Sequence, residues 1–387
     1  MKPFFLPLLL PLLLTGCGTM GWFGGDDVDA PAELEDLVSQ FPIKTLWSVS
    51  VGDGTDEQLV RLVPFVDRDR AYAAAYAGEV RAFDAHSGKL LWSNDTDLKI
   101  SGGPGVGEGV VLLGTGDAEL VVLDADTGAE KWRARLSSEA LSVPGAGNGV
   151  AVVHTLDGKL FGFDVEDGEQ LWVYDRATPI LTLYGSSSPV ISGDSVICGF
   201  ASGKLAALDL DSGGVRWEVS VSTPSGRTEL ERMVDIDGDP LLVDDTLYVT
   251  SYQGDLAAVS VETGVVLWRR KLSSYVGAGG DWRQIYSVDT QGKVWAIDQR
   301  NSSAVWQNDK LLHRRLSAPA VLGDYVLVGD FEGYLHWLAR EDGRIVARVR
   351  VGSDPISATP VVIDEVVYVY GDGGRLQALT PVLPGDS

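Results

Sequence analysis

One motif, Asp-x-x-x-Gly-x-x-x-Trp, recurs along this 387-residue chain at intervals of about 40 residues. Its copies, some with one position exchanged, begin at positions 84, 124, 164, 209, 260 and 298, and a degenerate copy without the Trp begins at 339. The successive intervals are 40, 40, 45, 51, 38 and 41 residues. Self-similarity at this period is typical of a propeller or a solenoid, in which each repeat buries its apolar face only against its neighbours.

Each repeat has the internal pattern of an antiparallel β-meander. In one copy, the apolar run Val110–Gly114 is followed by a Gly-containing turn and by a second run, Glu119–Asp124. The motif then reverses the chain into a strand that carries Trp132. The Gly of the motif accepts a positive φ at little steric cost, and the Trp is a large apolar side chain suited to filling the gap between neighbouring sheets.

The repeat count predicts an all-β fold, an eight-bladed β-propeller of four-stranded antiparallel blades over residues 43–382, followed by a tail of residues 383–387. The middle strands of an eighth unit are found at Val366–Thr380, and no Trp strand follows them. The missing strand is present at the other end, in Ile43–Val49. Pairing of the N- and C-terminal strands in one blade would close the ring and hide its edges. Seven blades is the alternative if the last unit is irregular.

The N-terminus has the features of an export signal. Residues 1–17 combine Lys2 with an apolar run that is too short to span a membrane. The ending Leu14-Thr15-Gly16-Cys17 resembles a lipobox, which predicts that Cys17 is acylated and begins the mature chain; the alternative is a signal peptide with an incidental Cys. No Asp follows Cys17, which favours the outer membrane, with the protein facing the periplasm. Residues 18–42 are predicted to be a flexible tether with a short helical turn at Pro31–Phe41.

Composition limits the classes of function. The formal net charge of −24 and the lack of a Lys/Arg run disfavour nucleic acid and favour basic partners. Once Cys17 is acylated, Cys198 stands alone in an apolar run and is predicted to be a buried strand thiol. The four histidines are scattered without metal-ligand spacing, and neither a nucleophile elbow nor a phosphate loop occurs. We therefore predict no catalytic residue, no cofactor and no metal site.

The repeat resembles the tryptophan-docking repeat of quinoprotein alcohol dehydrogenase-like propellers over nearly all of residues 43–382. Within this group the lipobox, acidic tether, eight repeats and length are similar to those of BamB-type lipoproteins of the outer-membrane β-barrel assembly complex. This resemblance implies a non-catalytic scaffold that binds the periplasmic POTRA domains of a BamA-type barrel insertase and other lipoproteins of the complex. It also implies a role in inserting β-barrel proteins into the outer membrane, with direct binding of unfolded outer-membrane proteins as an open additional role.

Two alternatives stay open beside this one. A quinone-dependent dehydrogenase shares the repeat, but such enzymes pair a vicinal Cys-Cys with calcium ligands, and no adjacent cysteines occur here. A generic periplasmic interaction propeller shares the fold and differs only in its partner.

The two longest intervals contain insertions between blades, at residues 176–189 and 229–240. Long loops on a rigid scaffold are where binding residues concentrate. In the family, the corresponding loops dock onto the insertase through a Leu-Thr-Leu-Arg segment and an Asp-x-Asp pair. The resemblance therefore implies a partner-binding role for a set of five residues, in which Tyr stands where the family has Arg: Leu181, Leu183, Tyr184, Asp235 and Asp237.

The residues themselves agree with this interpretation. Exposed leucines on a polar loop make an apolar anchor, and nearby carboxylates select a basic partner surface. Tyr184 is able to stack and to donate one hydrogen bond. Two alternatives remain, in which the leucines tuck under their own loop, or Asp235, Asp237 and Asp239 form a solvated turn or a weak calcium loop.

Overall fold

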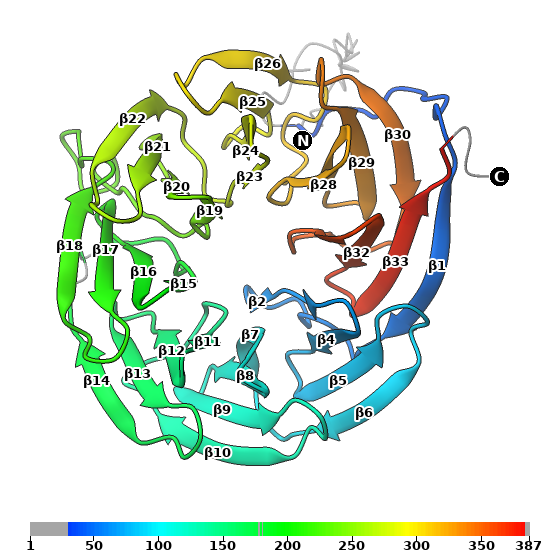
Figure 1. The fold of residues 1–387 in the computed structure, drawn as a ribbon. Coiled ribbons are helices and arrows are strands. Elements are labelled where there is room, and N and C mark those ends of the chain that lie inside the picture. The colour runs from blue at the N-terminus through cyan, green and yellow to red at the C-terminus, as the bar shows by residue number, and fades with distance from the viewer. Residues whose placement is uncertain (1–29, 177–178, 180, 384–387) are drawn as a thin grey trace, which may run out of the picture. The chain divides into compact units, whose positions relative to one another are not determined.

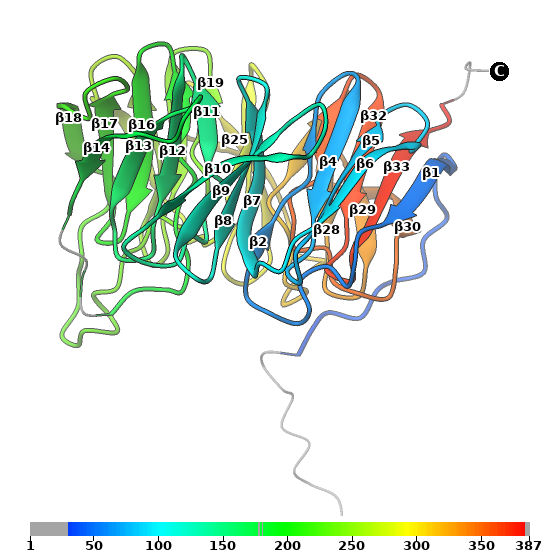
Figure 2. The same ribbon diagram turned by 90° about the horizontal axis from the view of Figure 1, so that it is seen from below.

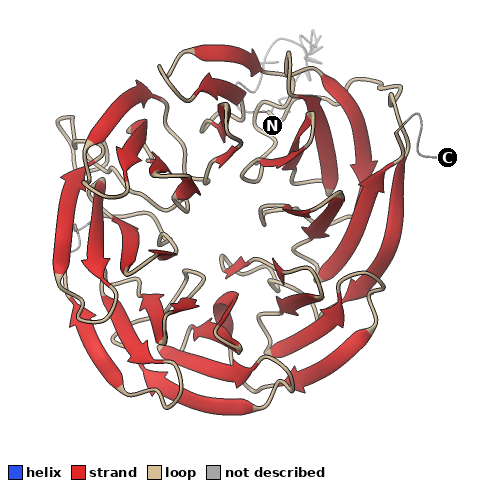
Figure 3. Ribbon diagram, viewed as in Figure 1, coloured by secondary structure: helices blue, strands red, loops and turns tan. Residues whose placement is uncertain are grey.

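The computed structural model describes residues 30–176, 179 and 181–383, so Cys17 and the predicted signal peptide lie outside the described residues. The chain divides into two units, Met1–Ala30 and Pro31–Ser387. Every regular element of the second unit in the described ranges is a strand (Figure 3). No helix that is long and apolar enough for a membrane span occurs in the described part of the chain.

Eight sheets are arranged in a ring, as the repeat count predicted, and the seven-bladed alternative is excluded (Figure 1). Seven sheets have four strands, and that of blade two has a fifth, β2, which pairs in parallel with β7. Blade one consists of β3 (Phe65–Val66), β4 (Arg70–Ala74), β5 (Glu79–Asp84) and β6 (Leu90–Asp95). Blade two consists of β2 (Arg61–Leu62), β7 (Ile100–Gly107), β8 (Val110–Thr115), β9 (Glu119–Asp124) and β10 (Glu130–Arg135). Blade three consists of β11 (Gly145–Gly147), β12 (Val150–His154), β13 (Leu160–Asp164) and β14 (Gln170–Tyr174), and blade four of β15 (Val190–Ser192), β16 (Ser195–Phe200), β17 (Lys204–Asp209) and β18 (Val215–Ser220).

The remaining blades continue the same order. Blade five consists of β19 (Leu241–Val243), β20 (Thr246–Thr250), β21 (Asp255–Ser260) and β22 (Val266–Lys271), and blade six of β23 (Gly279–Gly280), β24 (Gln284–Val288), β25 (Val294–Asp298) and β26 (Ala304–Asn308). Blade seven consists of β27 (Ala320–Leu322), β28 (Tyr325–Gly329), β29 (Tyr334–Ala339) and β30 (Ile345–Arg350). Blade eight consists of β31 (Val361–Ile363), β32 (Val366–Tyr370), β33 (Arg375–Pro381) and β1 (Ile43–Ser50).

Blade eight is shared between the two ends of the propeller, which confirms the predicted ring closure. Strand β1 pairs antiparallel with β33, so that Ile43 lies opposite Pro381 and Ser50 lies opposite Arg375. Figure 1 shows these two strands side by side, in blue and red. The pairing hides the strand edges that an open array would expose.

The motif Trp joins each blade to the next. The indole Nε1 of Trp92 donates to the backbone oxygen of Ala125 at 2.9 Å, and its ring lies over Gly128. A Cβ added at Gly128, where φ is +72°, would lie 2.4 Å from that ring, so both the conformation and the close approach require glycine. The equivalent bonds run from Trp47 to Ala85, Trp132 to Val165, Trp172 to Leu210, Trp217 to Val261, Trp268 to Gln299 and Trp306 to Arg340.

Blade seven has Ala347 where the other motifs have Trp, and the reason lies in the ring closure. The third and fourth strands of blade eight come from opposite ends of the propeller, so no motif turn is present there to receive a Trp. Phe41, which leads into β1, is 4% exposed and belongs to the same buried cluster as Ala347. Its ring packs on Tyr325 and Trp337, with centroid distances of 4.8 and 5.7 Å.

The segment before β1 lies against blades six and seven. The helical turn predicted for Pro31–Phe41 is not formed, because the backbone bonds to the blades instead of to itself: Ala32 N–H donates to Leu312 and Gln40 N–H donates to Val346, both at 2.9 Å. This part of the predicted tether is therefore fixed to the propeller, which differs from the expectation of a flexible segment reaching residue 42.

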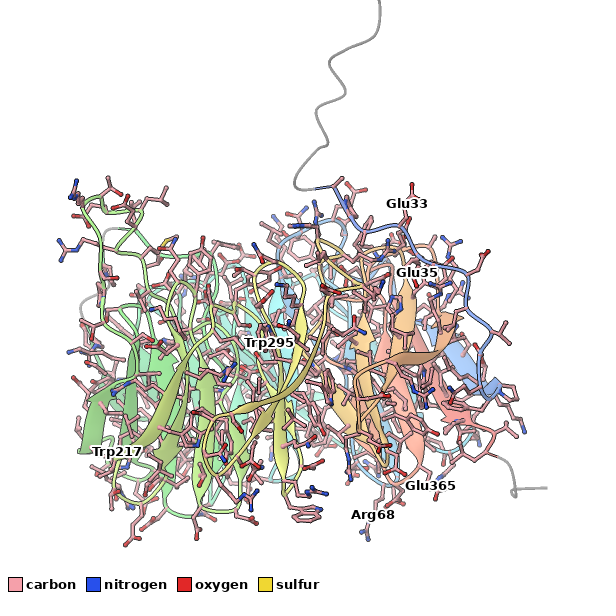
Figure 4. The ribbon with its side chains drawn as sticks, turned by 90° about the horizontal axis from the view of Figure 1, so that it is seen from above. Glu33, Glu35, Arg68, Trp217, Trp295 and Glu365 are labelled. Carbon is pink, nitrogen blue, oxygen red and sulfur yellow. The ribbon has the colours of Figure 1, made fainter. Side chains whose placement is uncertain are left out.

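The connections between blades lie together on one face of the propeller, called here the loop face. Both insertions predicted from the repeat intervals are inter-blade connections, at residues 175–189 between β14 and β15 and at 221–240 between β18 and β19. Figure 2 shows the described residues of both insertions on the same face. In Figure 4, Glu33 and Glu35 lie on this side, whereas Arg68 and Glu365 lie on the opposite one.

Candidate functional site

The first insertion brings two of the predicted contact residues to the surface. Leu181 is 45% exposed and Tyr184 is 54% exposed, whereas Leu183 between them is half-buried. The start of the insertion is held by Arg176, which forms an ion pair with Glu218 on β18. Hydrogen bonding to Arg176 holds the pKa of Glu218 at about 2. The start of the insertion is therefore fixed to blade four, and Leu181 and Tyr184 supply exposed apolar and aromatic groups.

Asp235 of the second insertion holds the first insertion in place. Its Oδ2 accepts a hydrogen bond from the backbone N–H of Leu183 at 2.5 Å, and its Oδ1 accepts one from Ser202 N–H at 3.4 Å. The side chain is only 1% exposed. Burial raises the pKa of this carboxyl, and the two backbone hydrogen bonds oppose that rise. The sequence pattern suggested a carboxylate facing a partner, and the structure instead places Asp235 beneath the loop.

Asp239 makes a second link between the insertions. Its Oδ1 accepts from the Ser188 N–H at 2.7 Å, and its Oδ2 forms an ion pair with Arg61 at 2.7 Å. The sequence offered Asp239 only as part of a turn or a calcium loop. Within the described ranges no three His, Cys, Asp or Glu side chains gather as a metal site, and Asp235 and Asp239 each accept bonds from chain nitrogens.

Asp237 differs from both of its neighbours. Its carboxylate accepts no side-chain or backbone hydrogen bond from the described residues, and it lines a hollow shared by residues of several inter-blade connections. The pKa of Asp237 is raised to about 7, mainly by burial and also by the nearby carboxylate of Asp235, while the Arg61 guanidinium opposes the rise. Of the three alternating carboxylates, this is the one to which the described residues donate no hydrogen bond.

Tyr184 does donate the single hydrogen bond that was anticipated for it, but to a residue of its own chain. Its hydroxyl donates to Glu139 Oε2 at 2.7 Å. Burial, together with the neighbouring Glu139 carboxylate, raises the pKa of Tyr184 to about 12. Glu139 lies on the connection between β10 and β11, and neither it nor Arg61 had a sequence signal that would have found it. For Asp239 the alternating Asp-x-Asp-x-Asp run was such a signal.

A buried polar cluster lies under the first insertion. His154 Nδ1 is 3.0 Å from the Ser187 carbonyl oxygen and 3.3 Å from Cys198 Sγ. Burial lowers the pKa of His154 to about 4 and raises that of the Cys198 thiol, so both groups are neutral near pH 7. Cys198 is 1% exposed on β16, which confirms the predicted buried strand thiol. A neutral buried thiol is a packing group and a poor nucleophile.

The geometry defines a class: a tryptophan-docking β-propeller of eight blades, closed by its two ends, with two linked inter-blade insertions on one face. A family model described as outer membrane protein assembly factor BamB matches residues 76–308.

Comparison with known proteins identifies the particular family. A relative from Pseudomonas aeruginosa, named outer membrane protein assembly factor BamB, is 51% identical over 373 residues, covering 96% of this chain and 97% of the relative. The crystal structure of BamB from Moraxella catarrhalis superposes with a TM-score of 0.80 at 28% identity, covering 88% of this chain and all of that one. The chain belongs to the BamB family of outer membrane protein assembly factors.

A quinohemoprotein alcohol dehydrogenase from Comamonas testosteroni is also similar in structure. Its TM-score is 0.68 at 13% identity, over 89% of this chain and 78% of the enzyme. At this identity the likeness shows a shared fold alone, so it does not favour the dehydrogenase alternative.

Proposed function

We propose that this chain is a non-catalytic scaffold lipoprotein that takes part in assembling outer-membrane proteins, and that its loop face docks a partner. Family membership supports the role. The observation that carries the docking face is the pair of links between the insertions, Asp235 to Leu183 and Asp239 to Ser188. Two loops that are tied together present one pre-organised surface, which lowers the entropy lost on binding.

The proposed partner is the periplasmic POTRA region of a BamA-type barrel insertase, in company with the other lipoproteins of the complex. Leu181 and Tyr184 supply exposed apolar and aromatic contacts of the kind that dominate binding energy, and the half-buried Leu183 lies between them in the sequence. Asp237 supplies a carboxylate that favours a basic partner. Asp235 acts by holding the first insertion in shape. None of these roles involves bond-making chemistry.

The proposal includes an outer-membrane location with the propeller in the periplasm. Acylation of Cys17 would anchor the chain, residues 18–30 would serve as the tether, and residues 43–382 would form the working domain. Cys17 and residues 18–29 lie outside the described residues. Several acyl chains on one cysteine suffice for stable anchoring.

Co-purification from detergent-solubilised outer membranes tests this function. We expect wild type to bring down the insertase, and we expect Leu181→Ala with Tyr184→Ala to lose most of it, because both side chains are exposed and neither supports the core. Asp235→Asn tests loop positioning separately. Leu267→Ala, an equally exposed leucine on β22, is the matched control and should behave as wild type.

The outcomes distinguish an error in the identity of the partner from an error in the location of the docking face. If all variants bring the insertase down as wild type does, the partner stands and the proposed face is wrong. If wild type fails to bring it down, the chain is an interaction propeller for another partner. Each of these conclusions requires that the circular dichroism spectrum of every variant match that of wild type, which shows that the variants are folded.

A further inference from the structure

A third segment meets the two insertions on the loop face. Residues 51–64 connect β1 of blade eight to β3 of blade one. One end is fixed to blade eight, where Thr55 N–H donates to the Asp372 carbonyl at 2.8 Å. The other end forms β2, which pairs with Gly102 and Gly103 of β7 in blade two, and there Leu62 is 3% exposed. The segment therefore crosses from blade eight to blade two and is held at both ends.

Arg61 on β2 ties this segment to both insertions. Its Nη1 donates to the backbone oxygens of Asp237 at 2.8 Å and Ser186 at 3.3 Å, and its Nη2 pairs with Asp239 Oδ2 at 2.7 Å. The other oxygen of Asp239 accepts from the Ser188 N–H. One guanidinium thus joins three segments that lie far apart in the sequence. Its planar fork suits this task, which a lysine ammonium would fill only in part.

Leu59 of the same segment is 80% exposed and lines a hollow of about 280 Å³. Two further exposed side chains share this rim, Tyr184 and Tyr275. A lone exposed leucine is unremarkable. Here, however, three exposed apolar or aromatic groups from three inter-blade connections line one hollow.

Polar groups without partners line the same hollow. The Asp237 carboxylate lacks a hydrogen-bond donor among the described residues, and Ser186 Oγ is buried without a hydrogen bond in the same part of the chain. A buried polar atom that stays unpaired costs free energy, so a ligand that pairs with it gains affinity. Among the described lining residues, Arg61 is the only arginine. Its guanidinium is already bonded to the Asp237 carbonyl and the Asp239 carboxylate, and not to the Asp237 carboxylate.

We propose that residues 55–63 form a third element of the partner-binding surface, with Leu59 as a contact residue and Arg61 as a positioning residue. The hollow takes one long cationic side chain of the partner. Its aliphatic stem packs between Leu59, Tyr184 and Tyr275, and its charged head meets Asp237 and Ser186. This arrangement satisfies both the apolar rim and the open carboxylate. The inference rests on the proposed function, because it concerns the same partner and face.

Binding of the full-length lipoprotein in detergent to the purified periplasmic region of the insertase tests the contact role. We expect Leu59→Ala to weaken binding about fivefold to tenfold, within the range of interface anchors. Leu267→Ala is the matched control and should leave the affinity unchanged.

Charge at position 59 tests the nature of the occupant. Leu59→Lys places a like charge beside a cationic side chain, so it should weaken binding more than Leu59→Glu does. Equal losses, or the reverse order, would overturn the cationic occupant.

Hydrogen exchange tests the positioning role of Arg61 with a readout that is independent of partner binding. In the free protein, Arg61→Met should speed exchange at the Ser188 amide about tenfold or more, since Asp239 loses the group that orients it. Amides in β8 and β16 should exchange as in wild type, and Arg61→Lys should be intermediate. Unchanged exchange at Ser188 would show that Arg61 does not position the loops.

Failure of this inference differs from failure of the proposed function. If Leu181→Ala with Tyr184→Ala weakens partner binding and Leu59→Ala does not, the loops dock the partner and the third element is wrong. If neither changes the affinity, the loop face itself is not the docking surface.

Discussion

Three acidic residues alternate along the second insertion, and the fold assigns them different tasks. Asp235 and Asp239 accept backbone N–H groups of the first insertion, and Asp237 between them does not. The sequence grouped Asp235 with Asp237 as partner-binding residues and left Asp239 aside, since alternation alone does not say which carboxylate meets a buried amide. The distinction depends on residues about 50 positions away along the chain.

The pKa of Asp237, raised to about 7, predicts a pH dependence of partner binding. The folded-state pKa lies above the ordinary value of 3.8, so the carboxyl holds its proton below pH 7 and ionises as the pH rises through 7. About a tenth is ionised at pH 6 and about nine-tenths at pH 8. Affinity for a basic partner should therefore rise by up to about tenfold from pH 6 to pH 8, measured by calorimetry at fixed ionic strength.

Asp237→Asn provides the control for that pH profile, because it removes the titrating group and keeps the shape. Its affinity should be low and nearly flat across the same range. A profile in the variant that matches wild type would assign the pH dependence to another group.

Ser302 occupies the glycine position of the sixth motif and adopts a φ of +59°. A residue with a Cβ pays about 1 kcal/mol or more in this region, and glycine avoids most of that strain at some cost in chain entropy. Ser302→Gly should therefore raise the free energy of unfolding by about 0.5–1 kcal/mol, seen as a higher calorimetric Tm. The reverse change in the preceding motif, Gly264→Ser, should lower the Tm, since a Cβ there would lie 2.6 Å from Trp217.

At the scale of elements, the degenerate seventh motif and the segment before β1 belong together. Phe41 fills the cluster that contains Ala347, in the one blade junction without a docking Trp. Phe41→Ala should lower the free energy of unfolding by about 3–4 kcal/mol, because it leaves a cavity in a buried aromatic cluster. Calorimetry checks this, with Val38→Ala as the control: Val38 is 93% exposed in the same segment. A Tm equal to wild type for Phe41→Ala would contradict the packing role.

The repeat predicted the strands and their count because each blade is set by local features: a Gly turn, an apolar run and a Trp. The order of β32, β33 and β1 in blade eight followed from the missing Trp strand at one end and its presence at the other. Local patterns do not encode contacts such as that between Arg61 and Asp239, which are 178 residues apart. Pro31–Phe41 was misjudged because its composition resembles a helical turn, whereas bonds to blades six and seven fix its backbone.

For the whole molecule, closure through β1 predicts a strong effect of a small change. Replacing Ile43–Ser50 by a Gly-Ser sequence of equal length removes the partner of β33 and the docked Trp47. We expect the Tm to fall by at least about 10 °C and the protein to associate through the exposed edge of β33, as light scattering would reveal. The same replacement at residues 384–387 serves as the control, and a monomeric ring with a normal Tm after loss of β1 would contradict the closure argument.

Ring closure also depends on the order in which the strands of the chain become available. In the order of the chain, β1 precedes every other strand of the propeller and its partner β33 comes last, so the ring cannot close until all eight blades have been made. Contacts this distant in sequence form slowly. A chain that ends before β33 leaves β1 without its partner strand, and the ring stays open with an exposed strand edge. A closed ring therefore forms only from a chain that contains both β1 and β33, so closure distinguishes a whole propeller from a shortened one.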